Sequence, residues 1–221
     1  MSGVPQGSVL GPVLFTIFIN DIDGGITNYI KKFADDTKLF DKSGTIEDTN
    51  SIRADLKCLE DWSNLWQMQF NADKCKVMYF GNKNIKAKYE IAGVEIGRVT
   101  EEKDLGIYID ENFKVGNQCC KAAKKGNKIL GMIARTFVTR SKKVMLRLYK
   151  SLVRPNLEYC IQAWRPHFVK DIEMLEKVQR RATRMMVGNR DMTYEGRLKY
   201  VGLTTLETRR ERADLLEVYK H

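Results

Sequence analysis

The spacing of apolar residues changes character within the first 112 residues. A period of three to four residues predicts one helix over residues 10–18 and a second over residues 52–66. Pro12 falls in the first turn of the first helix, where a missing N–H needs no partner. Short apolar runs between turn residues predict strands over residues 29–33, 37–40, 75–80, 89–91, 94–96 and 105–109. Helices mixed with antiparallel strands indicate an α+β fold here.

After residue 113 the strand pattern ends and only helical spacing continues. It predicts helices over residues 118–136, 141–153, 170–187 and 206–219. Ser141 and Asp171 are the expected N-caps, and Gly188-Asn189 is the expected C-terminal stop of the third helix. We therefore predict two domains, a mixed one over residues 1–112 and an all-helical one over residues 113–221.

The charge is divided in the same way as the pattern. Residues 1–110 contain 13 Lys/Arg and 17 Asp/Glu, whereas residues 111–221 contain 25 and 11, so the whole excess of +10 lies in the second half. Either a surface that binds a polyanion or a solvated basic helical surface produces such a distribution. Charge therefore narrows the class of partner without naming a function.

Several classes of protein are disfavoured by composition. The chain has no apolar run of about 18 residues, so we expect no membrane span, and its first residues lack the features of a secretory signal. The five cysteines are an odd number, and we expect reduced thiols. Cys119-Cys120, Cys160 and His167 lack the paired spacing of a zinc site, so no structural zinc is expected.

Asp35 and Asp36 are adjacent carboxylates at the turn between two predicted strands. Side chains alternate along a strand, so neighbouring aspartates converge on one ion only where the backbone bends. Carboxylate oxygens are hard ligands that suit Mg²⁺ beside substrate phosphates. The alternative is an ordinary turn, because aspartate also hydrogen-bonds its own backbone in turns. The flanking sequence has to decide between them.

The flanking segments resemble, in order, motifs of reverse transcriptases from non-LTR retrotransposons (LINE elements). Residues 3–12 (GVPQGSVLGP) resemble motif B, residues 33–39 (FADDTKL) motif C, residues 66–78 motif D, and residues 103–106 (KDLG) the strand that follows it. Residues 148–160 and 175–183 are similar to the thumb of the jockey-like and chicken-repeat-like clade. Ordered motifs at family spacing are far more specific than any one of them.

This resemblance implies a partial polymerase palm, an antiparallel sheet with packed helices that carries motifs B to E, followed by a basic helical thumb. It implies RNA-directed DNA synthesis, in which a primer 3′-hydroxyl attacks the α-phosphate of a dNTP beside two Mg²⁺ ions. By resemblance, Asp35 is the main metal ligand and Asp36 the supporting one. Lys74 matches a motif D lysine that assists the departing pyrophosphate, or else it is an exposed turn lysine that pairs with Asp73.

The resemblance also implies contacts with nucleotide, template and nucleic-acid backbone. The expected nucleotide- and template-binding residues are Pro5, Gln6, Gly7, Phe33 and Ala34. Glycine at position 7 would let substrate lie against backbone. The expected backbone contacts are basic residues of two predicted helices, namely Lys121, Lys124, Lys125, Lys128, Arg180, Arg181 and Arg184. The alternative for these is a solvated helix face.

One departure from the family pattern concerns motif A, which supplies a further metal-binding aspartate upstream of motif B. The sequence opens at motif B, and Asp21 and Asp23 fit capping or turn roles better than a replacement. We therefore expect a fragment or degraded copy of a longer element, or a chain completed by another, that is inactive alone. A non-catalytic nucleic-acid-binding remnant is the alternative. The expected partners are an RNA template, a DNA primer, dNTP and the missing palm and fingers, in nucleus and cytoplasm.

Overall fold

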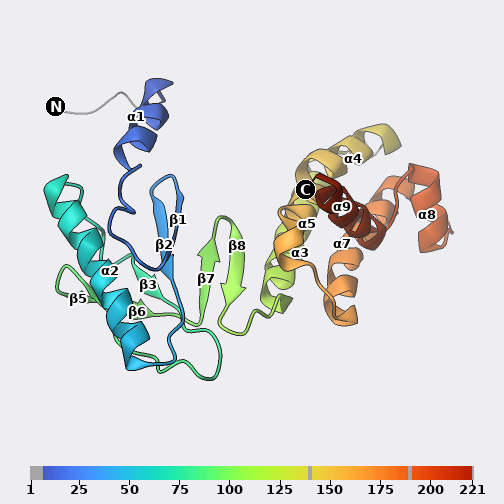
Figure 1. Cartoon of the computed structure of the whole chain (residues 1–221). Helices are drawn as coiled ribbons and strands as arrows, with labels where there is room; N and C mark the ends of the chain where they lie inside the picture. Colours follow the sequence, from blue (N-terminus) through green and yellow to red (C-terminus); the bar gives the residue numbers. More distant parts are fainter. Residues whose placement is uncertain (1–6, 139–140, 189–190, 221) are drawn as a thin grey trace. The chain divides into compact units, whose positions relative to one another are not determined.

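The computed structural model describes residues 7–138, 141–188 and 191–220, which divide into two compact units, Met1–Thr100 and Glu101–His221 (Figure 1). Pro5, Gln6 and Asn189 lie outside the described residues. The described residues combine helices with small two-stranded sheets, so the predicted α+β character is confirmed. No helix in these described ranges has both the length and the apolar character to cross a membrane.

The first unit combines two longer helices with three small sheets. Its elements are α1 (Leu10–Phe18), β1 (Tyr29–Phe33), β2 (Asp36–Phe40), α2 (Ile46–Leu65), β3 (Lys76–Val77), β4 (Glu90–Ile91), β5 (Val94–Glu95) and β6 (Gly97–Arg98). The β1–β2 and β4–β5 pairs are antiparallel hairpins, as expected, whereas β3 pairs with β6 in parallel. The strand predicted over residues 75–80 is wrong beyond β3, because only two of its residues find a partner strand.

A small core and one buried carboxylate hold the β1–β2 hairpin to α2. Ile19, Ile22 and Leu59 form the buried cluster. Asp55 of α2 is 1% exposed and accepts hydrogen bonds from the backbone N–H groups of Thr27 (3.0 Å) and Asn28 (2.9 Å), directly before β1. A buried carboxylate is tolerated only when it is paired or hydrogen-bonded, so this contact fixes the entry to the hairpin.

Helix α2 begins six residues before the predicted start. Thr45 accepts a hydrogen bond from the Asp48 N–H (3.1 Å), and the Asp48 carboxylate accepts one from the Thr45 N–H (2.9 Å). This capping box satisfies donors that a helix end otherwise leaves open. The apolar period misses this first turn because it is polar.

The second unit begins with a hairpin and continues in helices. Its elements are β7 (Glu101–Asp104), β8 (Ile107–Asp110), α3 (Gly116–Thr136), α4 (Lys142–Leu148), η1 (Tyr149–Val153), α5 (Arg154–Glu158), α6 (Ile161–Trp164), α7 (Val169–Val187), α8 (Tyr194–Val201) and α9 (Leu206–Lys220). One apolar core runs through it, with Tyr149, Leu157, Leu175 and Leu206 fully buried. Ser141 is the predicted N-cap of α4 and accepts from the Val144 N–H. Asp171 is not a cap, because α7 starts at Val169 and buries Asp171 in its first turn.

The helix predicted to end at Val153 instead continues through Pro155. Proline has no N–H and its ring displaces the carbonyl four residues earlier. Here the chain widens into the π-helical turn η1, in which the Arg154 N–H donates to the Tyr149 carbonyl five residues back. This turn absorbs the proline without ending the helix.

Candidate active site

The aspartate pair lies at the tip of the β1–β2 hairpin. Phe33 pairs with Asp36 in the register, so Ala34 and Asp35 form a two-residue turn. Ala34 has a φ of 52°, in the left-handed region that favours glycine. Strained non-glycine residues of this kind cluster at functional sites. Both aspartates, together with Ala34, are exposed, and so is Phe33.

The carboxylates of Asp35 and Asp36 are not used by the turn that carries them. Within the described residues neither accepts a hydrogen bond or joins an ion pair, whereas an aspartate that merely builds a turn bonds the local backbone. Asp21 and Asp23 differ. Asp21 accepts from the Trp62 indole N–H (3.0 Å), and Asp23 pairs with Lys32 (2.9 Å) of β1. Hydrogen bonding by Lys32 is also the main reason why the pKa of Asp23 is lowered.

A divalent metal fits the donor chemistry of the hairpin tip in part. Two exposed carboxylates match the one or two that proteins usually give Mg²⁺, which keeps waters and substrate phosphates as its other ligands. Among the described residues, however, no three or more His, Cys, Asp or Glu side chains form a group that could hold a metal ion. The hairpin therefore offers two ligands for one side of a metal site. The other described residues bring no further carboxylate ligand to it.

The other predicted site residues of the first unit sit in loops. Gly7 has a φ of 84° and open space where a Cβ would lie, so backbone conformation requires the glycine. Lys74 is exposed, and its N–H donates to the Asn71 carbonyl (3.0 Å). Within the described residues Lys74 makes no ion pair with Asp73 and neither a hydrogen bond nor an ion pair with the Asp35-Asp36 turn.

The predicted backbone contacts separate into engaged and exposed groups. Lys121 pairs with Glu101 and lies 3.2 Å from the centre of the Tyr108 ring. Arg180 is half-buried, lies 3.6 Å from the Glu173 carboxylate and stacks over Tyr194. Both cations are therefore engaged in contacts within the second unit.

The exposed group covers one surface of α3 and α7. Arg181 donates to Asn127 Oδ1 (3.0 Å), which brings the exposed face of α7 beside that of α3. We call this the α3–α7 basic surface, and it consists of Lys124, Lys125, Lys128, Lys177, Arg181 and Arg184, all exposed. Lys177 was not predicted, although its spacing of four from Arg181 places both on one helix face.

The comparison with known sequences decides the family. The sequence model for reverse transcriptase (RNA-dependent DNA polymerase) matches residues 1–134, which is more than half of the chain and includes the Asp35-Asp36 hairpin. The chain belongs to the reverse transcriptase family.

Curated relatives of this reverse transcriptase chain come from fly mobile elements. The RNA-directed DNA polymerase from mobile element jockey of Drosophila funebris is 28% identical over 176 residues, 74% of this chain and 19% of that protein. The probable RNA-directed DNA polymerase from transposon X-element of Drosophila melanogaster is 25% identical over 199 residues, 85% of this chain and 22% of that protein. The predicted kinship with jockey-like non-LTR elements is confirmed. The chain spans about a fifth of the length of these relatives, and no solved structure matches it significantly.

Proposed function

We propose that this chain is part of an RNA-directed DNA polymerase of a non-LTR retrotransposon, which copies an RNA template from a DNA primer with dNTPs. The observation that carries the proposal is the hairpin tip, where two aspartates of the family motif project from a strained turn and take no part in local hydrogen bonding. On resemblance alone, we expect the protein in nucleus and cytoplasm within a retroelement ribonucleoprotein.

In this mechanism the carboxylates of Asp35 and Asp36 would bind one side of a Mg²⁺ ion, with Asp35 as the main ligand. Bound Mg²⁺ supplies charge that stabilises the attacking and leaving oxygens. The Asp35 carboxylate is exposed at the hairpin tip, so it could bind metal without first breaking a contact with another residue. Lys74 would donate to the departing pyrophosphate, and Pro5, Gln6, Gly7, Phe33 and Ala34 would border the nucleotide and template. We propose that palm and thumb correspond to the mixed and helical parts, divided near residue 112.

To bind both metal ions of a two-metal site, the 221-residue chain should need a further carboxylate ligand that the described residues do not supply. Two adjacent aspartates cannot surround both metals of a two-metal site, and the described residues bring no third ligand close. We therefore expect no primer extension by the 221-residue chain alone. Joined in frame to a relative's preceding palm segment, it should extend a primer on RNA.

The decisive experiment compares two aspartate variants in that completed protein. Asp35→Asn should reduce extension roughly 10²-fold or more, since it removes a charged ligand of the metal that would stabilise the developing negative charge. Asp41→Asn changes an exposed aspartate just after the same hairpin and serves as the matched control, with activity retained. Equal activity of the Asp35 and Asp41 variants, or extension by the chain alone that survives Asp35→Asn, would refute the assignment.

A second function is supported by the α3–α7 basic surface, namely binding of an RNA–DNA duplex through its phosphates. On duplex DNA, each phosphate contact contributes about 0.9 to the slope of log affinity against log salt. Arg181→Ala with Arg184→Ala should therefore lower affinity and reduce the slope by about 1.8. Arg180→Ala should change the slope little, because Arg180 is engaged with Glu173 and Tyr194. An unchanged slope in the double variant would show that these charges only solvate the helix.

A further inference from the structure

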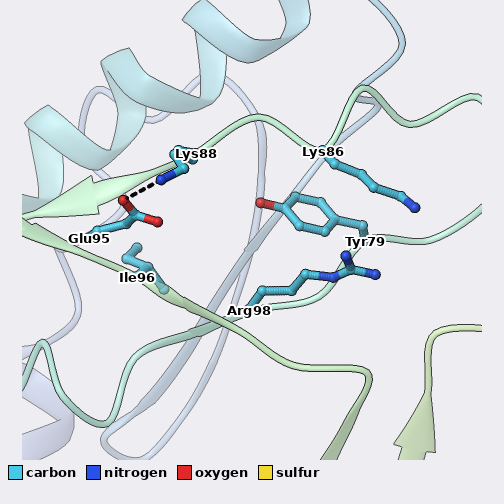
Figure 2. A pocket seen from close by; sticks show the side chains of 6 residues that line it. All are labelled: Tyr79, Lys86, Lys88, Glu95, Ile96 and Arg98. Carbon is cyan, nitrogen blue, oxygen red and sulfur yellow. Dashed lines mark hydrogen bonds and ion pairs between the residues drawn. The ribbon is translucent and has the colours of Figure 1, made fainter.

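Clustered cations of this chain differ in how they are compensated. In a small pocket of the first unit, Lys88 pairs with Glu95 at 2.9 Å, and the Arg98 guanidinium lies 5.6 Å from the centre of the Tyr79 ring (Figure 2). On the α3–α7 basic surface, by contrast, none of the six cations pairs with a carboxylate within the described residues. Their charge therefore stays available to an anion from outside the chain.

Arg181 is the cation of this surface that a neighbouring side chain orients. Its Nη1 donates to Asn127 Oδ1 at 3.0 Å, whereas the side chains of the other cations form no hydrogen bond in the part of the chain that the structure describes. An amide oxygen carries no net charge, so Asn127 orients the guanidinium without neutralising it. The guanidinium has further N–H groups in a fork that matches a phosphate, and Arg181 is exposed. Arg181 is thus oriented and still able to bind an anion.

Close packing of α3 against α7 brings these two side chains together (Figure 1). Gly126 directly precedes Asn127 and is buried. A Cβ at position 126 would lie 3.1 Å from Leu157 Cδ2 and 3.2 Å from Val178 Cγ1. These distances are tighter than ordinary contacts, and both neighbours are fully buried, so glycine is what permits this approach. Arg181 follows Val178 by one helical turn on the same side of α7, and it therefore reaches Asn127.

We propose that Asn127 is a positioning residue that makes Arg181 the principal phosphate contact of the α3–α7 basic surface. A long side chain loses rotamer freedom when it binds, and this loss lowers affinity. Arg181 has already lost part of that freedom in the unbound chain, because Asn127 holds it. Lys177 and Arg184 form no such hydrogen bond among the described residues, so the duplex itself must order them. The proposal rests on the duplex-binding function proposed above and adds which of its cations contributes most.

The test measures binding of an RNA–DNA duplex to the full 221-residue chain by fluorescence anisotropy across a salt series. Asn127→Ala should weaken binding about 2- to 12-fold at each salt concentration, which is the effect of ordering one mobile side chain. The salt slope should stay unchanged, because the slope reports the number of phosphate contacts and Arg181 keeps its charge. Asn117→Ala changes an exposed asparagine of the same helix, so it is the matched control and should bind like the wild type.

A double-mutant cycle tests whether Asn127 acts through Arg181. In an Arg181→Ala background, Asn127→Ala should cause no further loss of affinity. An equal loss in that background, a reduced salt slope, or wild-type affinity in a normally folded Asn127→Ala chain would each overturn the proposal.

A second variant decides if Asn127→Ala melts early. Arg181→Lys keeps the charge but loses the fork, so it should weaken binding at an unchanged slope, and wild-type affinity would overturn the proposal. If Arg181→Ala with Arg184→Ala leaves the slope unchanged, duplex binding through this surface fails as well. If that variant lowers the slope while Asn127→Ala has no effect, only the positioning role fails.

Discussion

Replacing Glu176 by alanine should strongly destabilise the second unit. Glu176 of α7 is 6% exposed and accepts from the Tyr194 hydroxyl, from the Gln179 amide (3.1 Å) and from the Leu206 N–H (3.0 Å) at the start of α9. It is also the strongest favourable charge acting on Arg210, which is 2% exposed and has two guanidinium nitrogens without hydrogen-bond partners in the described structure. One carboxylate thus joins three helices.

The magnitude follows from what the alanine would leave behind. Alanine would leave the Tyr194 hydroxyl and the Leu206 N–H without this acceptor, and each buried donor left unsatisfied costs about 1–3 kcal/mol, so the loss should be about 2–6 kcal/mol. For a chain of this size about 1 kcal/mol shifts the melting temperature by 2–4 °C, so a loss of roughly 10 °C is expected. Tyr194→Phe removes a single hydroxyl from the same network and should cost about 1–3 kcal/mol.

The assay is urea unfolding of the full chain followed by far-ultraviolet circular dichroism. Glu173→Ala, on the same helix but at a more exposed position, is the matched control and should cost less than about 1 kcal/mol, as expected for a surface pair. A Glu176 variant no less stable than the Glu173 variant would refute the reasoning about the buried network.

The same network predicts an alkaline limit to stability. Burial, followed by the hydrogen bond to Glu176, raises the pKa of Tyr194 above its ordinary value, and burial does the same for Tyr149. Groups whose pKa is raised on folding contribute stability that is present below the unfolded pKa of about 10 and is lost as pH rises above it. The unfolding free energy should fall above about pH 10, and less steeply in Tyr194→Phe.

Three further changes test local features. Ala34→Gly should stabilise the hairpin by about 1 kcal/mol, measured by urea unfolding, because glycine adopts the positive φ without strain; a loss would show that the side chain matters. Gly106→Ala should destabilise by roughly 1–3 kcal/mol in the same assay, since Gly106 has a φ of 91° and an added Cβ meets Tyr159 Cε1 at 3.3 Å; no change would contradict this contact. Asp48→Asn should cost less stability as the medium becomes acidic. The hydrogen bond from the backbone N–H of Gly44 is the main cause of the lowered pKa of Asp48. The ionised Asp48 therefore stabilises the fold above about pH 4, and this stabilisation is lost as pH falls through the folded pKa. A variant-to-wild-type gap that stays constant down to pH 3 would contradict that linkage.

Sequence patterns predicted the elements that can be recognised from their own apolar spacing, without knowledge of tertiary contacts. Helices α1, α3, α7 and α9 bury or present apolar residues at a regular period, and the β1–β2 hairpin was predicted with its turn. The apolar pattern missed strand β7, because all four residues of Glu101–Asp104 are charged and the strand forms through pairing with β8. Only the family resemblance placed a strand over residues 103–106, which overlaps the end of β7. Helix α8 was missed because it is short and contains Gly196, although Thr193 caps it.

Some residues of the candidate site could be predicted from the sequence, and others could not. Motif spacing located Asp35-Asp36 because the residues are contiguous and the turn is local. Charge counting could not separate Arg180 from Arg181, since adjacent residues of α7 face different neighbours: Arg180 meets Tyr194 at 5.0 Å, whereas Arg181 reaches Asn127 and remains exposed. Which basic side chain is engaged depends on tertiary contacts with α3 and α8 that no local pattern specifies.

Four other aspartates of the first unit are bound to structural partners, which distinguishes them from the pair at the hairpin tip. Asp48 caps α2, Asp55 anchors the segment before β1, Asp21 accepts from an indole and Asp23 neutralises a lysine. Each of these side chains has a structural partner, so metal binding there would cost an existing contact. The pair at the tip has no such partner within the described residues, yet the backbone carrying it is strained at Ala34. A turn built for stability alone would place glycine at that position and engage its aspartates with the backbone. Strain retained beside two unused carboxylates is therefore what physical chemistry expects of a ligand-binding turn.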